Sequence, residues 1–68
     1  MTTTIQTTEK TFNKKVKAQV LNLMPTAKRF NKKYVSQIGY VFYIKDENNM
    51  TLAKVFNEFG KGMIIYIG

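Results

Sequence analysis

The sequence predicts an α+β fold in which one basic amphipathic helix packs on a small, mostly antiparallel sheet. Two observations predict it. Residues 25–39 carry apolar side chains at helical spacing with cations on the opposite side. Residues 40–45 and 63–67 consist almost entirely of bulky β-formers. Turn residues separate these segments, and the expected element order is β-α-β-β-β.

The chain length limits the protein to one small domain. With 68 residues, it buries only roughly 60% of the surface that its unfolded chain exposes. Residues 1–11 contain six threonines and no periodic apolar pattern. We interpret them as a flexible N-terminal lead or a loosely held edge strand. Residues 12–68 are expected to form a single small α+β domain.

Residues 12–24 fit both kinds of secondary structure. Apolar residues alternate with polar ones at Val16, Ala18 and Val20, which favours a strand at about 15–23. Apolar residues also recur at helical spacings of four, four and three, at Phe12, Val16, Val20 and Leu23. Pro25 argues against one long helix through this region, because it removes a hydrogen bond and disfavours the α conformation at Met24.

The helix is expected at residues 25–39. Its predicted buried stripe is Ala27, Phe30, Tyr34 and Ile38, and its predicted cationic side is Lys28, Arg29, Lys32 and Lys33. Pro25 suits the first helical turn, where its missing N–H costs nothing, and Thr26 is a candidate N-cap. Gly39 suits the left-handed position that ends a helix.

A hairpin is expected after the helix. Residues 40–45 have β-formers on both faces and predict a central strand. Asn48 and Asn49 supply turn chemistry, because asparagine tolerates positive φ. With these two residues as the loop, Phe42 and Ile44 lie opposite Val55 and Ala53, in a strand at about 51–57.

The final third of the chain leaves one alternative open. Residues 51–59 also carry a helical stripe at Leu52, Val55, Phe56 and Phe59, which would give the order β-α-β-α-β. Gly60-Lys61-Gly62 predicts a turn. Residues 63–67 predict a last strand that is buried or paired at an interface, so a homodimer is left open.

Residue composition argues against enzymatic function. The sequence has no cysteine and no histidine, which excludes disulfides, thiolate ligands and the commonest general base. The neighbouring acids Asp46 and Glu47 lie in an expected turn and do not match a Ca²⁺-binding loop. We therefore expect a protein that is not an enzyme, with no metal site and no cofactor.

The charge is concentrated in the first half of the chain. Residues 1–34 hold eight cations and one acid, whereas residues 35–68 hold three of each, and the net charge is +7. This asymmetry indicates an anionic partner, although a solvated lysine-rich surface also keeps small proteins soluble. The apolar segments are too short to cross a bilayer and no signal peptide is evident, so we expect a cytoplasmic protein without a membrane partner.

The leading functional hypothesis is a small nucleic-acid-binding protein that contacts mainly the phosphate backbone of DNA or RNA, with low sequence specificity. The alternative is a small phage-type inhibitor or adaptor that binds an acidic surface of a larger host protein. Both use the same cations: Lys14, Lys15, Lys17, Lys28, Arg29, Lys32 and Lys33. Candidate stacking or anchor residues are Tyr40, Tyr43, Phe12 and Phe59.

Overall fold

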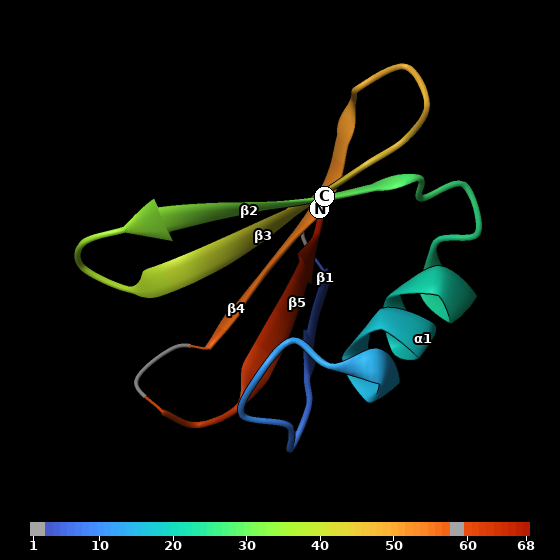
Figure 1. Ribbon diagram of the computed structural model, residues 1–68. Helices are drawn as coiled ribbons and strands as arrows, with labels where there is room; N and C mark the ends of the chain where they lie inside the picture. The colour runs from blue at the N-terminus through green and yellow to red at the C-terminus, as the bar shows by residue number, and fades with distance from the viewer. Residues whose placement is uncertain (1–2, 58–59) are drawn as a thin grey trace.

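The computed structural model describes residues 3–57 and 60–68, which form one helix and a five-stranded antiparallel sheet (Figure 1). The elements in chain order are β1 (Thr3–Gln6), α1 (Lys14–Leu23), β2 (Arg29–Val35), β3 (Gly39–Lys45), β4 (Thr51–Asn57) and β5 (Met63–Ile67). The predicted α+β class is confirmed. The predicted order β-α-β-β-β is found along the chain with one further strand, but the helix lies at different residues from those expected.

The helix is formed by the first of the two ambiguous segments, so the strand predicted at 15–23 is wrong. Asn13 caps α1, because its side-chain Oδ1 accepts a hydrogen bond from the Val16 N–H at 3.1 Å. Val16, Val20 and Met24 are buried at intervals of four residues, so helical spacing accounts for the burial and alternation does not. The helix ends at Leu23, and its C-cap Met24 is not helical, as the restriction that Pro25 places on the preceding residue favours.

Replacing Asn13 by alanine should destabilise the domain by about 1 kcal/mol, because the first helical turn loses its side-chain acceptor. For a domain of this size the melting temperature should fall by about 4–8 °C. Thermal unfolding followed by circular dichroism measures the change. Asn22→Ala is the matched control: Asn22 is exposed within the same helix, and alanine there should be neutral or slightly stabilising. Equal melting temperatures for the two variants would contradict the capping role.

The helix predicted at 25–39 is wrong, because residues 29–35 form strand β2 and pair with β3. The expected buried stripe does not exist: Tyr34 is 63% exposed and Ile38 is 37% exposed. Gly39 does adopt a positive φ of 85°, but this conformation reverses the chain in a hairpin instead of ending a helix. The Ile38 N–H donates to the Val35 carbonyl across this turn at 3.1 Å. Tertiary pairing with β3 therefore outweighs the helical spacing.

The β3–β4 hairpin has the predicted register as far as Ile44. The predicted two-residue loop is wrong, because the register shifts after Ile44, Lys45 pairs with Thr51, and the loop spans residues 46–50. Phe42 pairs with Val55, and Ile44 pairs with Ala53. Asn49 has a positive φ of 65°, and the Asp46 side chain closes the loop by accepting hydrogen bonds from the N–H groups of Asn48 and Met50. The predicted strand at 51–57 is thus confirmed.

The sheet order is β1-β5-β4-β3-β2, so β1 and β2 are the two edge strands. The predicted strand at 63–67 is confirmed and lies between β1 and β4. Its apolar residues are accounted for by this inner position. Thr3–Gln6 form β1, which is the edge-strand alternative for the N-terminal lead. The described part of the chain contains no helix long and apolar enough to cross a membrane.

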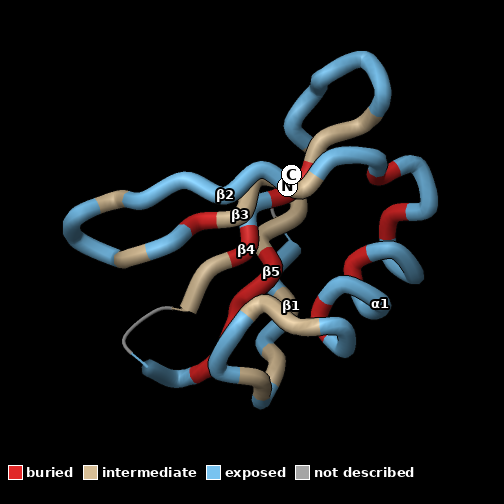
Figure 2. Tube along the Cα trace, in the orientation of Figure 1, coloured by how far each residue is buried: buried red, intermediate tan, exposed pale blue. Residues whose placement is uncertain are grey.

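The core lies between α1 and one face of the sheet, here called the helix side. Val16 and Val20 of α1 pack against Ile44, Val55 and Ile65. Figure 1 shows α1 near β5 and β1, while the β2–β3 hairpin extends away from it. Most of β2 is consequently exposed (Figure 2). The opposite face of the sheet is here called the open side.

Candidate functional site

Strand β2 divides its cations between the two faces of the sheet. Side chains alternate along a strand, and the pairing register places Lys32 opposite Phe42 on the helix side. Arg29 and Lys33 therefore lie on the open side. The single cationic helix face expected from the sequence is thus replaced by two smaller cationic surfaces on either side of one edge strand.

Three phenylalanine rings connect α1 to the hairpin on the helix side. The Phe12 and Phe42 rings stack with centroids 4.3 Å apart, and the Phe12 and Phe30 centroids lie 5.9 Å apart. The Lys17 ammonium of α1 lies 5.1 Å from the Phe30 centroid. An aromatic surface with a cation at its margin therefore continues from the core toward the free end of the hairpin.

Two exposed tyrosines extend this aromatic surface along the hairpin. Tyr34 and Tyr40 form a cross-strand pair with their ring centroids 5.3 Å apart, and they are 63% and 54% exposed. The Lys32 ammonium lies 4.1 Å from the Tyr40 centroid. A lysine at this distance from a ring makes a favourable cation–π contact. The hairpin thus presents aromatic faces and a positive charge together.

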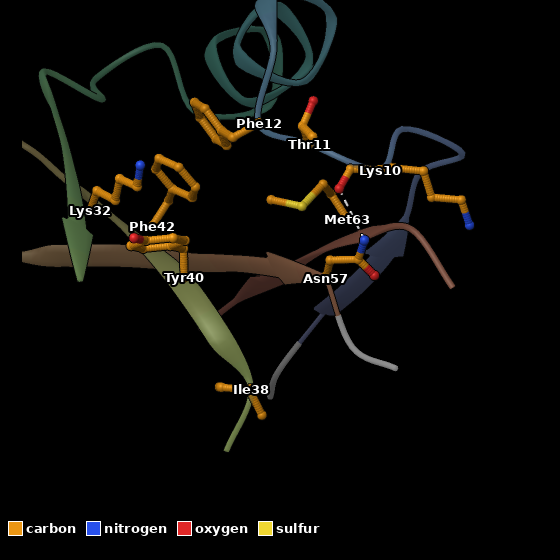
Figure 3. A pocket seen from close by; sticks show the side chains of 9 residues that line it. All are labelled: Lys10, Thr11, Phe12, Lys32, Ile38, Tyr40, Phe42, Asn57 and Met63. Carbon is orange, nitrogen blue, oxygen red and sulfur yellow. Dashed lines mark hydrogen bonds between the residues drawn. The ribbon is translucent and has the colours of Figure 1, made fainter. Parts of the chain in front are cut away.

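A cleft of about 330 Å³ lies beside these rings, and we call it the hairpin cleft. Figure 3 shows Phe12, Lys32, Tyr40 and Phe42 grouped on one side of it, with Asn57 and Met63 on the other. The residues that line it are Lys10, Thr11, Phe12, Lys32, Ile38, Tyr40, Phe42, Asn57 and Met63. These residues include no carboxylate, so the cleft is suited to a ligand with a planar apolar part and a negative charge.

Hydrogen bonds fix the wall of the hairpin cleft opposite the rings. The Asn57 side chain donates to the Lys10 carbonyl at 3.0 Å and accepts from the Gly62 N–H at 3.1 Å. The Lys10 ammonium donates to the Gly60 carbonyl, and it points away from the rings (Figure 3). Lys10 therefore shapes the cleft through its backbone, whereas Lys32 supplies the charge beside the rings.

The structure brings together some of the residues that the sequence singled out. Lys17, Lys32, Phe12 and Tyr40 gather on the helix side of the hairpin. Phe12 is half-buried and forms part of the cleft wall. Tyr43 lies on the open side, where the Lys54 ammonium is 5.9 Å from its centroid.

The remaining predicted residues lie elsewhere. Lys14 and Lys15 are exposed on α1. Lys28 is exposed between α1 and β2, where it lines a separate hollow with Asp46 and Glu47. Phe59 lies outside the described residues.

Sequence reasoning missed Tyr34 as an exposed residue of the site. The helical spacing of Tyr34 predicts a buried position, whereas the side chain is exposed beside Tyr40. Phe30 and Tyr34 are four residues apart, a spacing that places them on one face of a strand as well as of a helix, so the sequence held no signal that would have found Tyr34.

Within residues 3–57 and 60–68, no three acidic, histidine or cysteine side chains lie together in a group that suits a metal ion. Comparison of the chain with protein-family models, with curated proteins and with solved structures finds no significant match.

Proposed function

We propose that this protein binds nucleic acid through the hairpin cleft, with mainly phosphate-backbone contacts and low sequence specificity. One observation carries the proposal: the Lys32 ammonium lies 4.1 Å from the centroid of the half-exposed Tyr40 ring, at the mouth of a cleft lined by further rings. Proteins that bind single-stranded nucleic acid combine cationic grooves with aromatic rings on which bases stack.

The residue types determine which contacts are expected. Lysine is a point charge without the planar fork of arginine, so Lys17 and Lys32 suit phosphate oxygens better than base edges. Tyr34 and Tyr40 offer ring faces, and every base has a matching π face. An unpaired base stacked on the face of Tyr40 that Lys32 does not cover, with its phosphate near Lys32, satisfies both requirements. Such contacts do not distinguish one base from another.

We propose that the protein binds its ligand without catalysing a reaction. The sequence supplies no histidine or cysteine, and the residues that line the hairpin cleft include no acid that would act as a general base. Affinity, and not turnover, is therefore the property to measure.

Replacing Lys32 by alanine should weaken binding to a fluorescent oligothymidylate and flatten its salt dependence. Each lost phosphate contact lowers the slope of log K against log salt by roughly 0.7 for a single strand. Lys17→Ala should have a similar but smaller effect, because Lys17 lies at the margin of the rings. Fluorescence anisotropy over a series of salt concentrations measures both quantities.

Lys15→Ala is the matched control for this experiment. It removes the same charge from α1, but Lys15 lies roughly 160° around the helix from Lys17. The slope of log K against log salt for Lys15→Ala should stay close to that of the unmodified protein. Equal effects of Lys15→Ala and Lys32→Ala would show that net charge alone drives binding, and would refute a site at the cleft. Absence of binding at low salt would refute the proposed function.

A second candidate function is docking on an acidic surface of a larger protein. The observation that favours it is the position of β2 at the edge of the sheet, because an extended segment of a partner can add a strand to such an edge. Lysines on edge strands also prevent unwanted pairing of this kind. A pull-down from lysate with and without nuclease separates the two functions: retention of one protein that survives nuclease treatment supports the second.

A further inference from the structure

A second hollow lies at the edge of the sheet, mainly on the open side of β2 and β3, and we call it the edge hollow. It has a volume of about 480 Å³ and is lined by Asn31, Lys32, Lys33, Tyr43, Lys45 and Thr51. Three of these six residues are lysines and none is acidic. The Asn31 amide and the Thr51 hydroxyl add hydrogen-bond donors. This combination suits a phosphate group.

The pairing register concentrates positive charge beside the edge hollow. Arg29 lies directly opposite Lys45 across the β2–β3 pair. Like charges in this position destabilise a sheet, and Lys45 is itself one of the lysines that line the hollow. An anion bound over this pair, on the open side of β2 and β3, would reduce this repulsion.

The two hollows meet at one residue. Lys32 lines both the hairpin cleft and the edge hollow. Lys32 belongs to β2, which is an edge strand, so in the described part of the chain no further strand lies beyond it. A flexible ligand can therefore pass from one face of the hairpin to the other around this edge.

We propose that a single-stranded nucleic acid bound in the hairpin cleft continues around the edge of β2 and places a phosphate in the edge hollow. This inference rests on the proposed function and names its substrate class. A duplex is excluded as the main ligand, because its persistence length of about 50 nm prevents a turn around one strand of a sheet. A single strand makes the turn by rotation about its backbone bonds.

The test compares the double variant Lys33→Ala/Lys45→Ala with the unmodified protein, using oligothymidylates of about 4 and about 10 nucleotides, lengths within the usual site sizes of small binding domains. NMR titration of ¹⁵N-labelled protein measures weak and strong binding alike. The double variant should lose about tenfold in affinity for the longer oligomer and less than twofold for the shorter one. Only the longer oligomer should shift the amide signals of Lys45 and Thr51.

Lys14→Ala/Lys15→Ala is the control, since it removes two charges without touching either hollow. If the unmodified protein binds neither oligomer, the proposed function fails together with this inference. If both oligomers bind but the double variant lowers the affinity for both equally, or for neither, the path around β2 is refuted. Binding at the hairpin cleft then remains supported. Equal affinity for a blunt duplex of the longer sequence would also refute it.

Discussion

Alanine at Gly62 should strongly destabilise the domain. A Cβ atom at this position would lie 2.4 Å from the backbone oxygen of Thr7, and Gly62 has a φ of 116°, which side chains rarely adopt. Both effects act in the native state, and together we expect a loss of at least about 2 kcal/mol. A domain of this length has a total stability of only about 3–10 kcal/mol. Urea unfolding followed by circular dichroism measures the loss.

Gly60→Ala is the matched control in the same turn. Gly60 also has a positive φ, of 72°, but a Cβ atom there meets nothing within 4 Å. Its expected cost is limited to the left-handed conformation, about 1–2 kcal/mol. The difference between the variants therefore measures the close approach to Thr7 together with the less favourable φ of Gly62. Equal destabilisation by both alanines would contradict this explanation.

Replacing Tyr40 by alanine should cause the largest loss of nucleic-acid affinity from any single substitution. The stacking of one base on an aromatic side chain contributes about 1–3 kcal/mol, which corresponds to a roughly 5- to 150-fold loss. The variant also removes the ring over which Lys32 lies. Anisotropy with a fluorescent oligothymidylate at low salt measures the effect.

Tyr40→Phe is the control that preserves the ring, and it should bind within about twofold of the unmodified protein if stacking is the dominant contact. Met50→Ala removes an equally exposed apolar side chain from the β3–β4 loop, away from the cleft lining, and should leave affinity unchanged. Both tyrosine variants should retain the melting temperature within a few degrees, because Tyr40 is exposed. An unchanged affinity of Tyr40→Ala would exclude stacking at the hairpin cleft.

The sequence predicted the second half of the fold because several local signals agree there. Bulky β-formers fill β3 and β5, Asn49 tolerates the positive φ of its turn, and Gly60 and Gly62 permit the next one. The register of β3 and β4 followed from placing apolar residues opposite apolar residues. One competing helical pattern in β4 did not outweigh this agreement.

The first half was misassigned because its apolar spacing satisfies two periods at once. Helical spacing in residues 12–24 and in residues 27–38 is equally regular. What distinguishes the two segments is their tertiary contacts: Val16 and Val20 reach the sheet core, whereas residues 29–35 complete a hairpin with β3. Propensity and spacing are weak predictors when long-range pairing decides the outcome.

The error in secondary structure also changed the candidate site. On a helix, Lys32 and Lys33 would share one cationic face; on strand β2 they point to opposite faces of the sheet. Tyr34, which the helical spacing predicts to be buried, is exposed for the same reason. Most residues of the proposed sites could thus be predicted from the sequence, but which of them lie together could not.

By itself, the sequence determined the α+β class, the positive charge of the first half, the absence of histidine and cysteine chemistry, and the strands of the last thirty residues. Only the tertiary structure decided which ambiguous segment forms the helix and which cations meet which rings. The physical reason is that local composition fixes which backbone conformations are accessible. The choice between accessible conformations depends on burial against residues distant in the chain, and this choice also determines the face on which each side chain lies.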